Sequence, residues 1–174
     1  FLKGLIEVLV VGTVVYLTLT YGVQNIRVSG SSMEPTLHDA DYLLANKLVY
    51  LRFDPDSLRK WLPFMNVEGD SPVFAFHPPN QGDVIIFSRE DSSSGYFVKR
   101  IVGVAGDVVE IKRGQVYING MALNDPYITS ASRDSVRALR IPPQSYYVLG
   151  DNRNASTDSR CRTSAIMGRF QTWN

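Results

Sequence analysis

The feature that most constrains this chain is an uncharged apolar run near its N-terminus. No Asp, Glu, Lys or Arg occurs from Val8 to Ile26, which is 19 residues (26 − 8 + 1). At about 1.5 Å per residue, a helix of this length nearly crosses the ~30 Å hydrocarbon layer of a membrane, whereas strands are much shorter. The run therefore predicts a single transmembrane helix that anchors the chain, over residues 1–26.

Two other interpretations of the run remain open. It could be a buried core helix, although a helix that is apolar on all sides fits poorly in a small globular domain. It could also be a cleaved leader, but the run is long for one and no small-x-small cleavage site follows it. The flanking charges, Lys3 and Arg27, do not decide the orientation across a membrane.

Beyond Arg27 the chain consists of short apolar runs separated by turn residues. Val, Ile, Tyr and Phe dominate runs such as DYLLANKLVYL, GDVIIFSR, GYFVKRIVGV and QSYYVLGDN. This pattern is typical of short antiparallel strands, and VVEIKRGQVYING predicts a hairpin that turns at Arg113-Gly114. Residues 27–174 are therefore predicted to form one mainly β, antiparallel domain of the sandwich or barrel type.

Two stretches are predicted to be loops. Residues 51–81 contain five prolines and several aromatic residues, and so long an insertion loop is often functional. Its aromatic side chains could enter a membrane interface or pack beneath the loop. Residues 129–138, TSASRDSVRA, predict a polar surface loop.

The charge and the cysteine and histidine content of the chain argue against nucleic-acid binding, disulfides and zinc sites. The formal net charge of +1 provides no strong field for nucleic acid. Cys161 is the only cysteine, so no internal disulfide forms, and two histidines without a CxxC or HExxH pattern argue against a zinc site. No cofactor or metal is expected.

Ser32, in SGSSMEPTL, is a candidate nucleophile. Pro35 keeps the preceding chain extended or turning, which places Ser32 on an irregular segment. His38 followed by Asp39 suggests a Ser-His-Asp triad, but triad partners usually come from separate elements. This spacing favours a polar turn over a triad.

Lys99 is the alternative base. It lies in the apolar run GYFVKRIVGV, where strand alternation places Lys99 and Arg100 on opposite faces, so one of the two points inward. Burial would lower the lysine pKa, and a neutral amine can accept a hydroxyl proton. An edge-strand lysine that merely reaches solvent is the competing interpretation.

A third segment, GDNRNASTDSR at residues 150–160, combines Asp, Asn, Arg and Ser. It could be an Asx-rich turn, but its alternating charges indicate a braced loop.

These segments together resemble one known family. SGSSMEPTL, GDVIIF, YFVKRIVGVAGD and GDNRNASTDSR occur in this order behind the apolar run, and they closely resemble the boxes of the type I signal peptidases. The match extends from the apolar run to about residue 160. It implies a membrane-anchored serine endopeptidase that removes N-terminal signal peptides from exported preproteins. It also implies a β-rich catalytic domain on the extracytoplasmic side of the cell membrane, with preproteins and membrane lipid as partners.

The resemblance also implies residue roles. Ser32 would be the nucleophile and Lys99 the general base, without a histidine. Ser156 would hold the lysine amine, and Asp158 would pair with Arg160, with Arg100 as a further partner. The start of the last box is matched by Gly150, Asp151 and Asn152.

The chain departs from many relatives at Gly30, where they carry a serine that helps the oxyanion hole. Ser31 is then a candidate for the second donor, beside the Ser32 backbone N–H.

Two other functions share part of this pattern. A self-cleaving Ser-Lys protease of the SOS-repressor type would carry a DNA-binding module in place of the apolar run. A tethered β domain that only binds partners would not need both Ser32 and Lys99.

Overall fold

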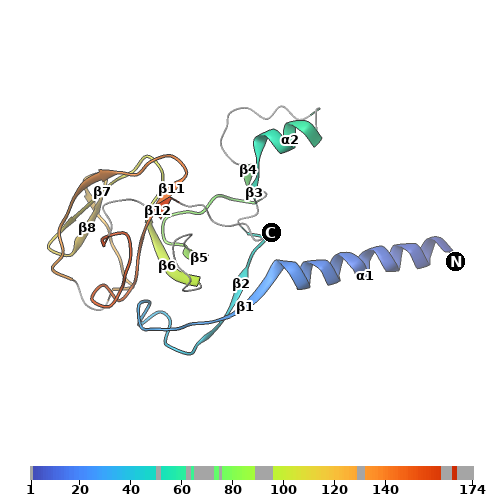
Figure 1. Cartoon of the computed structure of the whole chain (residues 1–174), viewed down its shortest axis with the longest axis horizontal. Coiled ribbons are helices and arrows are strands. Elements are labelled where there is room, and N and C mark those ends of the chain that lie inside the picture. Colours follow the sequence, from blue (N-terminus) through green and yellow to red (C-terminus); the bar gives the residue numbers. More distant parts are fainter. Residues whose placement is uncertain are drawn as a thin grey trace. The chain divides into compact units, whose positions relative to one another are not determined.

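The computed structural model describes residues 2–49, 52–61, 64, 73–74, 76–88, 96–128, 132–161 and 166–167. It combines an N-terminal helix with several antiparallel sheets (Figure 1). The chain divides into two compact units, one formed by residues 1–27 and 42–78 and the other by residues 28–41 and 79–174. The prediction of antiparallel sheets is confirmed; the described residues form a mixed structure of helices and several such sheets.

The N-terminal helix α1 (Leu2–Gly22) is followed directly by strand β1 (Val23–Arg27). No helix in the described part of the chain is both long and apolar enough to span a membrane. The sequence pattern predicted helix through Ile26, but α1 ends at Gly22. Only 15 uncharged residues, 8 to 22 (22 − 8 + 1), are helical, about 22 Å of helix.

A tight connection explains why the helix ends there. β1 pairs antiparallel with β2 (Tyr42–Asn46), from Val23 opposite Asn46 onward, and the Gly22 carbonyl accepts a hydrogen bond from Lys47 N at 2.8 Å. A Cβ on Gly22 would lie 2.8 Å from Leu48 Cδ1. Glycine thus lets the hairpin close against the end of the helix.

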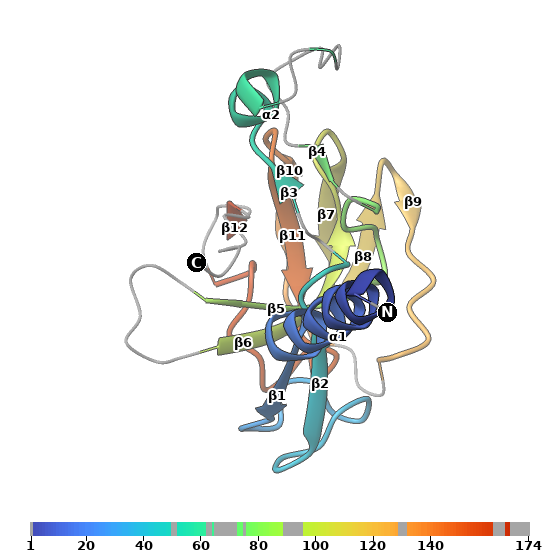
Figure 2. The same cartoon turned by 90° about the vertical axis from the view of Figure 1, so that its right-hand side faces the viewer.

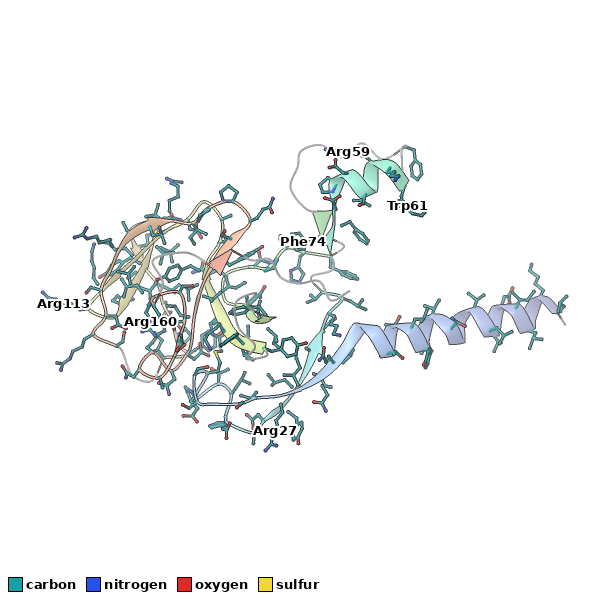
Figure 3. The ribbon with its side chains drawn as sticks, in the orientation of Figure 1. Arg27, Arg59, Trp61, Phe74, Arg113 and Arg160 are labelled. Atoms are coloured by element: carbon teal, nitrogen blue, oxygen red, sulfur yellow. The ribbon has the colours of Figure 1, made fainter. Side chains whose placement is uncertain are left out.

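The predicted 51–81 loop contains regular structure in its described part. β3 (Arg52–Phe53) pairs with β4 (Val73–Phe74), and α2 (Pro55–Trp61) follows β3. Asp54 caps α2, because its carboxylate accepts a hydrogen bond from Ser57 N at 3.0 Å. Trp61 and Phe64 are each 81% exposed (Trp61 is labelled in Figure 3), so these two aromatic side chains do not pack beneath the loop.

The second unit contains two four-stranded sheets. The first has the order β10-β7-β8-β9, from β7 (Val108–Lys112), β8 (Gln115–Ile118), β9 (Met121–Ala122) and β10 (Val136–Arg140). The predicted hairpin turn is confirmed: Arg113 and Gly114 join β7 to β8 with φ of 49° and 86°, the signs of a type I′ turn. Arg113 is labelled in Figure 3.

Strand β10 corrects the prediction of a polar loop at residues 129–138. Its Val136 and Leu139 pack against the core from an otherwise polar strand. The strand was not predicted, because two apolar side chains in a polar stretch are too weak a pattern to indicate a strand.

The second sheet has the order β12-β11-β6-β5, and it carries the candidate site. Its strands are β5 (Val84–Ser88), β6 (Tyr96–Gly103), β11 (Ser145–Leu149) and β12 (Ile166–Met167) (Figure 2). β6 lies between β5 and β11, so both of its edges are hydrogen-bonded. The two sheets share one hydrophobic core, made of Val102, Val109, Ile111, Val116, Ile118, Ile141, Tyr147 and Leu149.

Candidate active site

The loop that carries Ser32 is closed at its base and anchored in the core. Val28 N donates to Asp41 O at 2.8 Å, and Ala40 N donates to Val28 O at 3.0 Å. Met33, the neighbour of Ser32, is only 1% exposed. Ser32 itself is half-buried. The nucleophile candidate is therefore held on a fixed, irregular segment, as its sequence predicts.

Lys99 on β6 meets Ser32 across 67 residues of sequence. Its Nζ lies 2.8 Å from Ser32 Oγ, within hydrogen-bond distance, and it donates a second hydrogen bond to Val98 O at 2.8 Å. The lysine is only 3% exposed. The two residues are thus in contact in a setting that excludes most water.

Burial lowers the pKa of Lys99 below its usual 10.5, and the negative charges of Asp158 and Asp151 oppose this only in part. The neutral amine is favoured because the ammonium form loses hydration on burial. The adjacent hydroxyl is the partner from which such an amine can take a proton.

Arg100 is also buried, at 6% exposure, so the expectation that only one of the two basic residues points inward is wrong. Its guanidinium binds both carboxylate oxygens of Asp151, Nε at 2.9 Å and Nη2 at 2.7 Å, and donates to Gly82 O at 2.8 Å. Burial alone would lower the pKa of Arg100, but the hydrogen bonds and charge of Asp151 raise it. The two neighbours on β6 therefore differ in charge. Burial favours the uncharged form of Lys99, whereas Arg100 is a cation paired with Asp151.

Asp158 pairs with Arg160, as predicted, and not with Arg100. Arg160 Nε and Nη2 each lie 2.9 Å from an Asp158 oxygen (Arg160 is labelled in Figure 3). Asp158 also accepts a hydrogen bond from Gly150 N at 3.1 Å. Since Arg100 is fully engaged by Asp151, the alternative pairing with Asp158 is wrong.

Gly150 and Asn152 lie directly against the backbone of Ser32. Asn152 N donates to Ser32 O at 3.1 Å. A Cβ built on Gly150 would lie 2.4 Å from Ser32 O and 2.3 Å from Ser156 Oγ. No residue larger than glycine fits at this position without moving Ser32.

Ser156 lies next to Gly150, but its predicted hydrogen bond to Lys99 is not formed. Its Oγ is buried and has no hydrogen-bond partner within the described residues. Such an orphaned hydroxyl is uncommon, and rotation about its Cα–Cβ bond redirects it without moving the backbone. The role of Ser156 in holding the amine stays a prediction.

The remaining sequence candidates lie around the Ser32 loop. Gly30, at φ 92°, donates its N–H to Asp39 Oδ1 at 2.7 Å, and Ser31 O accepts from Glu34 N at 3.2 Å. His38 Nδ1 lies 3.8 Å from Asp41 on the exposed side of the loop, in keeping with a turn.

Sequence reasoning missed three residues that contact this site, Thr36, Asp125 and Tyr127. Thr36 donates to Asp151 at 2.5 Å, and the Tyr127 ring centroid lies 3.5 Å from Arg100 Cζ. Asp125 forms a buried ion pair with Arg153. These contacts span 27 to 115 residues of sequence, so no local pattern signals them.

No three His, Cys, Asp or Glu side chains gather closely enough to hold a metal ion among the residues that the structure describes.

Replacing Lys99 with methionine should stabilise the fold, because burying this amine costs free energy. The pKa of Lys99 is lowered on folding, so the unfolded chain binds more protons and wild-type stability rises with pH up to about 10.5. The urea midpoint of Lys99→Met should therefore exceed that of the wild type at about pH 6, and the gap should shrink towards about pH 10. Lys112→Met, at an exposed lysine, is the control. A lower midpoint for Lys99→Met at the acid pH would contradict the burial argument.

Comparisons with known proteins point to one family. Residues 2–173 match the family described as signal peptidase, peptidase S26. The probable signal peptidase I-1 of Synechocystis sp. is 32% identical over 167 residues, 91% of this chain and 73% of that protein. A signal peptidase I of Bacillus amyloliquefaciens is 33% identical over 143 residues, 76% of this chain and 61% of that protein. The crystal structure of a signal peptidase I from Enterococcus faecalis V583 gives a TM-score of 0.43 at 29% identity, over 48% of this chain and 86% of that one; the sequences carry the assignment.

Proposed function

This chain belongs to the signal peptidase family, peptidase S26, whose serine endopeptidases remove signal peptides, and we propose that Ser32 and Lys99 are its catalytic dyad. The observation that carries the proposal is the 2.8 Å separation between a buried Lys99 Nζ and Ser32 Oγ. A lysine amine that is shielded from water and lies beside a hydroxyl group can accept the proton of that hydroxyl.

In the proposed mechanism the Lys99 amine acts as the base in two successive steps. Neutral Lys99 takes the Ser32 proton while Oγ attacks the scissile carbonyl carbon. The tetrahedral intermediate then collapses, the C–N bond breaks, and the lysine proton goes to the leaving amine. This leaves the signal peptide as an ester on Ser32. Water then loses a proton to Lys99, attacks the ester carbon, and the proton returns to Ser32 as the acid product leaves.

The other buried charges hold this geometry. Asp151 is fixed by Arg100 through two hydrogen bonds, and Asn152 then meets the Ser32 carbonyl through its own N–H. Positioning of this kind supplies part of the rate, because a displacement of about 1 Å can cost roughly 100-fold.

The substrates are preproteins that carry signal peptides, and we propose that they are exported ones bound at their cleavage segment. An extended peptide with small side chains at alternate positions can add to a sheet edge. The β5 strand, next to β6 and at the end of the sheet order, would form one wall for such a segment.

We propose that the protein acts at the extracytoplasmic face of the cell membrane and contacts lipid. The side chains of α1 that support this are apolar and exposed, among them Leu9, Val10 and Val11. Vesicles of neutral phospholipid should retain the full chain in a flotation assay, and a variant with Leu9, Val10 and Val11 changed to serine should be retained less. Equal recovery of both proteins in the vesicle fraction would argue against lipid contact through α1.

The pH dependence of cleavage tests the dyad. Because burial lowers the pKa of Lys99 and only the neutral amine is a base, kcat/KM for a precursor peptide should fall as pH decreases through that pKa. The fall should be about tenfold per pH unit once the amine is largely protonated. A profile that stays flat from about pH 5 to 9 would count against Lys99 as the base.

A further inference from the structure

One segment between β9 and β10 contacts both the 150–160 loop and strand β6. It consists of residues 124–127, Asn-Asp-Pro-Tyr. The Asp125 carboxylate forms an ion pair with Arg153 in which the side chains are 5% and 2% exposed. The Tyr127 ring lies against Arg100, with the guanidinium carbon 3.5 Å from its centroid.

Each of these two cations, Arg153 and Arg100, forms a hydrogen bond with residue 150 or 151, next to Ser32. Arg153 Nε donates to Gly150 O at 3.0 Å, and Gly150 is packed against the Ser32 carbonyl. Arg100 holds the Asp151 carboxylate, and the next residue, Asn152, donates to Ser32 O. The segment 124–127 thus contacts both cations that hold residues 150–152.

The ion pair is not arranged for greatest stability. Two buried charges lose hydration, and apolar residues of similar volume often stabilise a fold as well or better. One Asp125 oxygen, Oδ1, is also buried with no hydrogen-bond partner in the described residues. What the pair does provide is orientation, because the planar guanidinium of Arg153 fixes the direction of its bond to the Gly150 carbonyl.

We propose that residues 124–127 form a brace for the catalytic loop, and that Asp125 is a positioning residue that acts on Gly150 and Ser32 through Arg153. The proposal rests on the function proposed for Ser32 and Lys99. Asp125 takes no part in proton transfer, so its loss should lower kcat without shifting the pH at which Lys99 titrates.

The test compares a single variant with a double variant in the full chain. Asp125→Asn leaves Arg153 charged and unpaired, and should lower both the melting temperature and kcat, the latter by about 10- to 100-fold. Asp125→Leu with Arg153→Met removes both charges and should recover the melting temperature. Its kcat should remain low, because Gly150 O has lost its donor, while KM stays near the wild-type value. Arg137→Gln, at an exposed arginine of β10, is the matched control.

The double variant decides the outcome even if Asp125→Asn does not fold. A folded double variant with wild-type kcat would overturn the brace, since stability alone would then explain the pair. So would an Asp125→Asn enzyme that folds and has wild-type kcat. Ser32→Ala, assayed alongside, separates the two proposals: if it cleaves at the wild-type rate, the dyad itself is wrong, whereas an inactive Ser32→Ala with an active double variant refutes only the brace.

Discussion

Lys99→Met should cleave a precursor peptide about 10²- to 10⁴-fold more slowly than the wild type, the range for removal of a general base. Methionine resembles lysine in length and apolar volume, so the β6 core stays filled while the amine 2.8 Å from Ser32 Oγ is lost. The loss should appear in kcat, because the lysine acts on the nucleophile and not on substrate binding.

Three companion variants make this result specific. Ser32→Ala should be at least as inactive as Lys99→Met, and combining the two should cost little more, because residues of one catalytic unit are not additive. Lys112→Met, at an exposed lysine on β7, should cleave at the wild-type rate. Processing by Lys99→Met at the wild-type rate would rule out the dyad.

The second large effect should come from Gly150→Ala. The added methyl group would lie 2.4 Å from the Ser32 carbonyl oxygen, and a backbone atom cannot move aside as a flexible side chain can. We expect Ser32 to shift away from Lys99, with kcat reduced by about 100-fold and a loss of about 1–3 kcal/mol in the free energy of unfolding. Steady-state kinetics and urea unfolding measure the two effects.

Gly12→Ala is the control for this variant, because nothing lies within 4 Å of a Cβ at that position. It should leave both kcat and unfolding by urea unchanged or slightly improved. If Gly150→Ala cleaved peptides at the wild-type rate, the close contact with Ser32 would not constrain the nucleophile.

Much of the fold is predictable because strand patterns are local. The β7–β8 hairpin follows from Arg113-Gly114 between two alternating runs, and β6 follows from an apolar run in the sequence. The end of α1 at Gly22 was not predicted. It depends on the close approach of Leu48, which lies just after β2 and does not enter a count of uncharged residues before Arg27.

The proposed dyad, Ser32 and Lys99, and several supporting residues such as Asp158 and Arg160 could be named from the sequence, but not all of the contacts between them could. Strand alternation suggested that Lys99 or Arg100 points inward, yet both are buried. Lys99 contacts Ser32, and Arg100 is enclosed by Asp151 and Tyr127. The partner of Arg100 is Asp151, 51 residues away. No periodicity relates such positions, so the sequence alone could not choose between Asp151 and Asp158.

The titration of Lys99 itself tests the central claim most directly. Lysine labelled with ¹³C at Cε can be followed by NMR in the full chain, with the Lys99 signal identified by its absence from Lys99→Met. Lys112, whose pKa is raised by its hydrogen bond to Glu110, provides an internal contrast. We expect Lys99 to titrate below 10.5, at the same pH as the acid limb of kcat/KM. A Lys99 signal that titrates at or above 10.5 would contradict it, since the amine would then be protonated whenever the enzyme works.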